Sequence, residues 1–119
     1  MKMIITGSVI SKKNSRINTR SGRSFPSKDY TAWNKTAVTE MKQQFAGYVI
    51  TKYPISLRVV FFWRDLRRHD IDNSISSVQD SLVDAGIIID DDFNHINKII
   101  GEYGGLDRVN PRCEIYIDE

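Results

Sequence analysis

Cysteine is nearly absent from this sequence, which has one, Cys113, among 119 residues. A single thiol forms no internal disulfide, and it excludes a structural zinc site built from several cysteines. Apolar runs are short, and none approaches the roughly 18–20 residues that cross a bilayer. The opening residues MKMIITGSVI have a broken apolar stretch, so we expect a strand there rather than a signal peptide. These absences predict a cytoplasmic protein of a reducing compartment with no membrane contact.

Nucleotide-binding glycine motifs are also missing. No G-x-x-x-x-G-K segment occurs, so we expect no ATP or other nucleotide cofactor. Hydrophobic residues make up 40% of the chain and charged residues 27%, which is typical of a soluble globular protein and excludes a disordered one. The length predicts one domain spanning residues 1–119.

Charge is divided sharply along the chain. Residues 1–35 contain eight Lys or Arg against one acid, Asp29. Between His69 and Asn97 there is no Lys or Arg, and there are seven aspartates. One interpretation is a solvated surface with self-complementary charge. The other is a polyanion-binding arm beside a divalent-metal site, and charge alone leaves both open.

Hydrophobic periodicity predicts two helices and four main strands. The polar stretch 12–24 is expected to be a loop or a ragged hairpin, and Gly104-Gly105 to begin a turn. The order β-α-β-α-β-β indicates an α/β (α+β) two-layer sandwich, with two main helices against a mixed sheet. Trp33, Trp63, Cys113 and the run 87–89 are expected in the core. The predicted strands cover residues 3–10, 54–63, 95–103 and 112–118, and the predicted helices cover 28–46 and 71–85.

Two aspartates flank Ile71 where the second helix should begin. A D-x-D pair at a strand-to-helix junction can direct both carboxylates, Asp70 and Asp72, at one spot. Mg²⁺ prefers oxygen ligands and is often held by one or two carboxylates together with substrate phosphate. The alternative is ordinary helix capping, because Asp is a favoured N-cap and acids suit the first turn.

A second acidic group, Asp90-Asp91-Asp92, follows the isoleucine run. Alone it would be interpreted as a solvated turn. Three adjacent carboxylates repel one another, however, and a bound cation would relieve that repulsion. We expect the start of the second helix to lie beside residues 90–92, so that both acidic groups share one cation.

The segment from Arg67 to Asn73, followed by Asp80, Ala85-Gly86-Ile87 and Asp90-Asp91, resembles the RusA family of Holliday junction resolvases. The family pattern is a basic run, R-D-x-D-N, a helix and a G-x-x-x-D-D ending. The resemblance implies a small homodimeric endonuclease of bacteria or their prophages. It implies Mg²⁺, with Mn²⁺ as a substitute, as the cofactor and branched DNA as the partner.

The same resemblance assigns roles to single residues. Asp70, Asp72 and Asp91 correspond to the essential metal-binding aspartates, and Asn73 and Asp90 to supporting positions. Two positions depart from the family: Ser76 stands where a catalytic lysine is usual, and His69 stands where Arg is usual. The residues that could supply the missing cation are Lys12, Lys13 and Lys98.

A nuclease of this kind needs basic side chains around its acidic site, because DNA would otherwise be repelled. The alternative for each such residue is an ordinary solvated surface position. Three function hypotheses remain: a junction-resolving endonuclease making paired nicks, a catalytically silent branched-DNA-binding module, and a regulatory domain whose aspartates are caps and turns. The candidate DNA contacts are Lys12, Lys13, Arg16, Arg20, Arg23, Arg67, Arg68 and His69.

Overall fold

The computed structural model describes residues 1–12, 17–45 and 47–119. Two of the expected DNA contacts, Lys13 and Arg16, lie outside the described residues. In the described part of the chain, no helix is long and apolar enough to cross a membrane.

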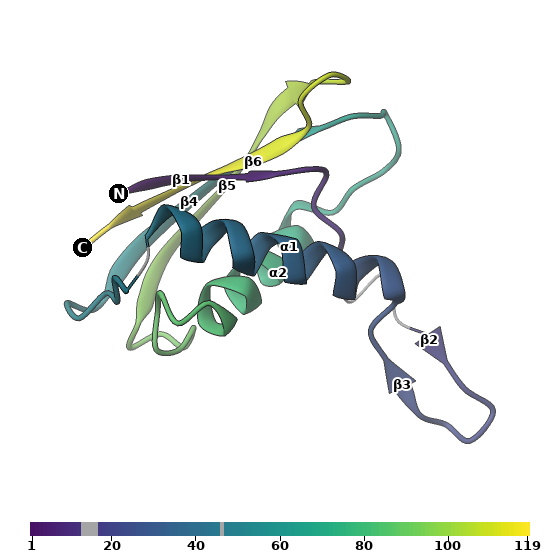
Figure 1. Ribbon diagram of the computed structural model, residues 1–119, viewed down its shortest axis with the longest axis horizontal. Coiled ribbons are helices and arrows are strands. Elements are labelled where there is room, and N and C mark those ends of the chain that lie inside the picture. The colour runs from purple at the N-terminus through teal and green to yellow at the C-terminus, as the bar shows by residue number, and fades with distance from the viewer. Residues whose placement is uncertain (13–16, 46) are drawn as a thin grey trace.

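A four-stranded mixed sheet forms one layer of the molecule (Figure 1). Its order is β1-β6-β4-β5, with β4 and β5 parallel and the other neighbours antiparallel. Together with two helices, this sheet confirms the predicted fold class. The strands are β1 (Lys2–Thr6), β4 (Ile55–Trp63), β5 (Ile96–Leu106) and β6 (Arg112–Asp118).

Two helices cover one face of this sheet. In α1 (Lys28–Gln44), Ser27 is the N-cap, and its hydroxyl accepts a 3.1 Å hydrogen bond from the Tyr30 N–H. The second helix, α2 (Ile71–Asp84), has Asp70 as its N-cap residue. Helix α1 packs on β1, α2 packs against β5, and the helices contact each other.

The core lies between the helices and the sheet. In β4, Leu57, Val59 and Phe61 are almost fully buried, as expected for a central strand rich in β-branched and aromatic residues. Trp33 is buried on α1 and Cys113 on β6, which confirms both predictions. Burial raises the pKa of the Cys113 thiol to about 12.

One part of the core prediction is wrong. Ile87 and Ile88 are buried, but Ile89 is 63% exposed. The Ile89 N–H donates to the Tyr53 hydroxyl at 3.0 Å, so the backbone is anchored while the side chain points to solvent.

The connection from β4 through α2 to β5 determines where the acidic groups lie. Parallel strands need a crossover, so α2 carries the chain back to the end of the sheet where β4 began. The Ile55 N–H donates to the His95 carbonyl at 2.8 Å at that end. Asp70 therefore follows the far end of β4, whereas residues 85–95 lie at its beginning.

The predicted turn at Gly104-Gly105 is wrong, because β5 runs on to Leu106. The register with β4 shifts between Phe61 and Phe62, and Gly104 is the extra residue of this bulge. A Cβ at Gly104 would lie 2.5 Å from the Phe62 ring, so only glycine fits beside that ring. The two glycines thus bend the strand instead of ending it.

A second close approach brings α2 onto β5. A Cβ added to Gly101 would collide with the side chains of Ile71 and Ile75. The missing side chain lets the first two turns of α2 rest against the strand. This contact sets the position of the helix start that carries Asp70 and Asp72.

The polar stretch between β1 and α1 contains a hairpin, in agreement with the ragged hairpin expected from the sequence. Strands β2 (Ile17–Asn18) and β3 (Ser24–Phe25) pair antiparallel and form a sheet of their own. The hairpin projects from the start of α1, away from the main sheet (Figure 1).

Candidate active site

Asp70 and Asp72 lie at the start of α2, as the D-x-D spacing predicts. Asp70 occupies the N-cap position, but its side chain makes no capping hydrogen bond. Its Oδ2 accepts a 3.3 Å hydrogen bond from the Asn73 amide. Asp72 is exposed in the first turn. Simple capping therefore does not account for the Asp70 carboxylate.

A cavity of about 360 Å³ opens beside Asp70. Its walls bring a carboxylate, two hydroxyls and two guanidinium-bearing side chains around one space. Both arginines are exposed, and Asp70 is half-buried. The cavity can therefore accommodate an anionic group beside a carboxylate that can hold a cation. The lining residues are Val9, Ile10, Ser11, Arg67, Arg68, His69, Asp70 and Ser74.

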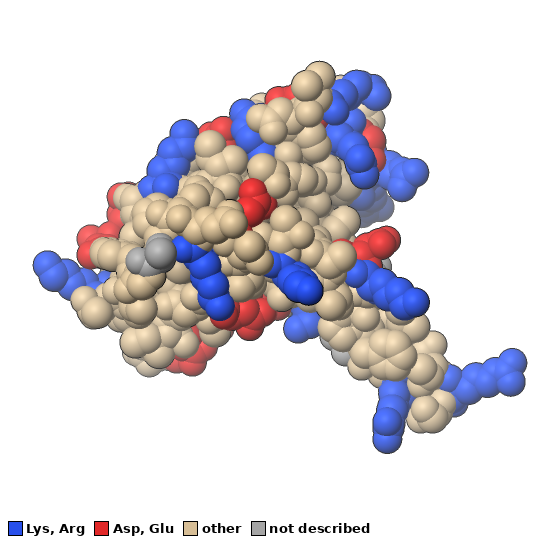
Figure 2. Space-filling model, viewed as in Figure 1, with Lys and Arg blue, Asp and Glu red and all other residues tan. Residues whose placement is uncertain are grey.

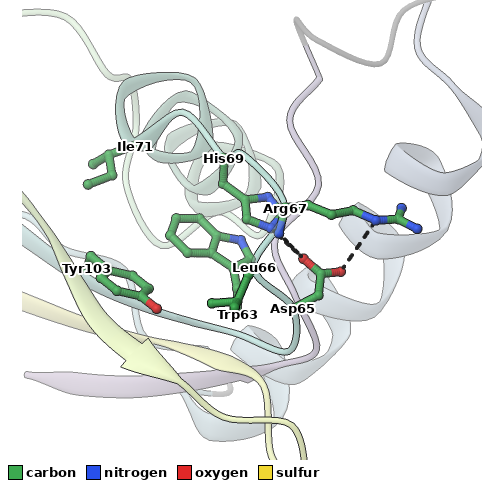
Figure 3. A pocket seen from close by; sticks show the side chains of 7 residues that line it. All are labelled: Trp63, Asp65, Leu66, Arg67, His69, Ile71 and Tyr103. Atoms are coloured by element: carbon green, nitrogen blue, oxygen red, sulfur yellow. Dashed lines mark hydrogen bonds and ion pairs between the residues drawn. The ribbon is translucent and has the colours of Figure 1, made fainter.

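His69 is held rigidly next to this site (Figure 3). Its ring stacks on the Trp63 indole, with centroids 4.5 Å apart and planes 3° apart. Its Nε2 lies 3.2 Å from Asp65 Oδ1, which also accepts the Arg67 N–H at 3.1 Å. The hydrogen bond with His69, and then the one from Arg67, lower the pKa of Asp65. The loop before Asp70 is thus ordered by its own side chains.

A smaller cavity of about 210 Å³ lies on the other side of this loop. Its walls are partly apolar and partly polar or charged (Figure 3), and its lining residues are Trp63, Asp65, Leu66, Arg67, His69, Ile71 and the exposed Tyr103. Tyr103 lies on β5, which is the edge strand of the sheet next to α2.

The second acidic group is exposed and engaged in local contacts. The Asp91 N–H donates to Asp90 Oδ1 at 2.8 Å. Asp92 Oδ1 lies 2.6 Å from His95 Nδ1, and this hydrogen bond lowers the pKa of Asp92. The ring of His95 in turn meets Tyr53 edge-on at 4.7 Å. These contacts fix residues 90–95 at the beginning of β4.

The expectation that the helix start lies beside residues 90–92 is wrong within one chain. The 14 residues of α2 separate Asp70 from the acidic group, and a helix of that length spans roughly 20 Å. The parallel crossover places the two groups at opposite ends of β4. Among the described residues, no three His, Cys, Asp or Glu side chains form a group that could hold a metal ion.

Ser76 lies half-buried on α2, and two of the three candidate lysines lie elsewhere on the described surface. The Lys12 N–H donates to Ser77 Oγ at 3.1 Å, and its ammonium lies 3.8 Å from Asp80. Lys12 therefore rests on α2 one turn beyond Ser76. Lys98 instead lines a cavity on the uncovered face of the sheet, beside Arg58.

Basic side chains lie on the hairpin, on α1 and in the loop before α2, whereas α2 itself has none. Figure 2 shows Lys and Arg side chains extending from the projecting hairpin, with Asp and Glu on the body of the molecule in this view. Arg20 and Arg23 are exposed on that hairpin, and Arg67 is exposed beside the Asp70 cavity. The described candidate DNA contacts thus lie on separate elements.

Sequence reasoning overlooked Asp65 and Ser74. Asp65 stands four residues before His69, a spacing that predicts contact on a helix but not in the loop where both lie. Ser74 gave no signal, because a serine on a helix becomes a cavity wall only when residues 9–11 pack beside it.

Paired carboxylates beside guanidinium groups on a small α+β fold are typical of enzymes that act on phosphodiesters. The family model for endodeoxyribonuclease RusA matches residues 6–118. The chain is also 32% identical over 107 residues to the crossover junction endodeoxyribonuclease RusA of Aquifex aeolicus (strain VF5), covering 86% of this chain and 84% of that protein. The chain therefore belongs to the RusA family of endodeoxyribonucleases.

Proposed function

We propose that this protein is a Mg²⁺-dependent endonuclease that resolves four-way DNA junctions by paired, symmetric nicks. The observation that carries the proposal is the cavity in which Asp70 faces Arg67 and Arg68. The name of the Aquifex aeolicus relative, a crossover junction endodeoxyribonuclease, supports the branched substrate. For a bacterial or phage enzyme, such DNA lies in the cytoplasm.

The donor set at the helix start suits magnesium. Asp70 and Asp72 offer hard oxygen ligands, and the Asp70 carboxylate is not used as a cap. Mn²⁺ accepts the same ligands. When bound, the cation supplies a nucleophilic water and neutralises charge on the phosphate.

Side chains of the protein itself bind the phosphate and position the groups around it. Arg67 and Arg68 bind and orient the phosphate that faces Asp70. The Asn73 amide holds the Asp70 carboxylate in one orientation. His69, fixed by Trp63 and Asp65, keeps the loop in place and can contact a neighbouring phosphate. Positioning of this kind contributes much of the rate in phosphoryl-transfer enzymes.

Asp91 joins this site from a second copy of the chain. Because it lies at the far end of α2, it cannot share an ion with Asp70 and Asp72 of its own protomer. A two-fold axis would bring the Asp91 loop of each protomer to the helix start of the other. The homodimer then contains two complete sites, one for each nick, with Asp90 as a supporting ligand.

The surface that suits this dimer is the edge of β5. The strand is paired on one side only, and four large apolar residues on it are exposed. An unprotected edge of this length readily pairs with another strand. Antiparallel pairing of two β5 edges points the Asp91 end of one protomer toward the Asp70 end of the other. The exposed residues are Ile99, Ile100, Tyr103 and Leu106.

A labelled four-way junction incubated with Mg²⁺ tests the proposal against its rivals. We expect two symmetric nicks, and no nicks when EDTA replaces Mg²⁺. Binding without nicks would favour a silent branched-DNA-binding module, for which the absence of a lysine at Ser76 is the motivating observation. Neither binding nor cutting would favour a regulatory domain.

A further inference from the structure

The β2–β3 hairpin is a separate arm, because its two strands pair with each other and not with the main sheet. The Thr19 N–H donates to the Arg23 carbonyl at 2.9 Å, and the Gly22 N–H donates to the Thr19 carbonyl at 3.1 Å. Gly22 has φ +82°, which the tight return requires. A two-stranded ribbon alone is only marginally stable in water, so an exposed one is expected to have a partner.

Between this arm and the start of α1 lies a groove of about 370 Å³ with an apolar floor. Two large apolar side chains border it and remain exposed, Ile17 at 42% and Phe25 at 43%. Pro26 and Ala32 complete the floor. Nothing in this set can form a catalytic or metal site, so the groove suits binding.

The rim of the groove is cationic. Lys28 and Lys35 line it, and Arg20 and Arg23 stand on the adjoining hairpin. In the described part of the chain, none of these four forms an ion pair. Figure 2 shows the same concentration of Lys and Arg along the projecting arm. The occupant is therefore anionic at its edges and apolar in its centre.

An unstacked nucleobase with its flanking phosphates has this distribution of charge. In an intact duplex both faces of each base are covered by neighbours, and only the phosphates are accessible. At a branch point, bases can leave the stack and expose an apolar face. Aromatic side chains bind such faces regardless of sequence, while Lys and Arg hold the adjoining backbone.

We propose that the hairpin groove binds an unstacked base at the branch point, with Phe25 as the stacking platform, and thereby gives the enzyme its preference for branched over linear DNA. This inference rests on the proposed junction substrate. It separates two tasks: Phe25 recognises the branch, and the surrounding cations bind any DNA backbone.

Binding measured in EDTA, where no cutting occurs, tests whether branch recognition by Phe25 is separate from backbone binding by the surrounding cations. We compare a four-way junction with a duplex of the same arm sequence. Phe25→Ala should weaken junction binding about tenfold and leave duplex binding and the salt dependence of both unchanged. Phe25→Tyr keeps the ring and should bind like the wild type. Arg20→Gln and Arg23→Gln should each weaken both substrates and lower the salt slope by about one.

A matched control is Tyr48→Ala, which removes an equally exposed ring, 45% exposed, beyond the other end of α1. It should change neither affinity. A second probe leaves the protein unaltered: 2-aminopurine placed at the branch nucleotides should be quenched by wild-type protein and not by Phe25→Ala. Removing the base at the same positions should weaken wild-type binding by a factor similar to that of Phe25→Ala.

Three results would overturn the inference: an equal loss on junction and duplex, unchanged binding of the abasic junction, or conversion of Phe25→Ala from dimer to monomer in light scattering. The last result would show that the groove is an interface between copies of the chain. If the wild type does not prefer the junction at all, the proposed function itself fails, which is a separate outcome.

Discussion

The two carboxylates at the start of α2, Asp70 and Asp72, have different surroundings although they are only two residues apart. Asp70 is half-buried, bonded to Asn73 and faces the arginine-lined cavity, whereas Asp72 is exposed. Both lie beside a helix N-terminus, whose dipole attracts anions. A bound Mg²⁺ would attract the same two carboxylates more strongly.

Asp72→Asn should abolish cutting and leave junction binding equal or tighter. The change removes a metal ligand and one negative charge that faces the DNA. Gel-based cutting and fluorescence anisotropy measure the two properties separately. Asp84→Asn, an exposed acid at the other end of α2, is the control and should change neither. A parallel loss of binding and cutting in Asp72→Asn would contradict its assigned role.

Asp65→Asn should lower stability at neutral pH and flatten its dependence on acid. The pKa of Asp65 is lowered in the folded protein, so its contribution is present above the ordinary value of 3.8 and is lost as the pH falls through the folded value. Urea unfolding of both proteins between pH 2.5 and about 7 measures this difference. Identical acid profiles would mean that the Asp65–His69 contact has no energetic role.

At the scale of elements, the packing of α2 on β5 controls where the active-site carboxylates stand. Gly101 provides the space into which Ile71 and Ile75 pack. The helix start is thereby fixed by a residue about thirty positions later in the chain. Activity should therefore respond to a change that touches neither DNA nor metal.

Gly101→Ala should destabilise the protein by about 1–3 kcal/mol and reduce cutting, because the added methyl group forces α2 away from the strand. Urea unfolding and the cutting rate measure the two effects. Adding Ile75→Val shortens the opposing side chain and should restore part of both. Failure of the double variant to recover either property would argue against a steric origin.

The whole molecule decides whether the proposed nuclease site is complete. Asp70 and Asp91 belong to opposite ends of one protomer, so the proposed site exists only where two protomers meet. This arrangement couples assembly to catalysis, and it can be tested by combining two inactive chains.

Asp72→Asn and Asp91→Asn should each be inactive alone, yet their mixture should recover cutting. In the mixed dimer one site combines both substitutions and the other contains none, so single nicks should replace paired ones. If instead each site were formed by a single protomer, every site in the mixed dimer would contain one substitution, and the mixture would stay inactive. Light scattering of the separate variants confirms that each still forms a dimer.

Salt should weaken junction binding steeply. The cations of the hairpin, of α1 and of the loop before α2 neutralise several phosphates, and each releases counterions. A plot of log affinity against log salt between about 50 and 200 mM should be linear with a steep negative slope. A flat plot would contradict a binding surface built on these residues.

Local features of the site could be predicted from the sequence. The D-x-D spacing, the amphipathic pattern after it and the β-branched strand before it depend on neighbouring residues, and each appears where it was expected. The pattern from Arg67 to Asp91 also indicated the RusA family, which the family match confirms.

The relation between the two acidic groups was decided only by the tertiary structure. Whether Asp91 approaches Asp70 depends on β4 and β5 being parallel, which sends α2 across the length of the sheet. Parallel and antiparallel pairing are chosen by packing over the whole sheet, and short-range spacing does not encode that choice. The bulge at Gly104 and the packing of Ile75 against Gly101 were also decided only by the tertiary structure, because each depends on a strand or helix distant in the chain.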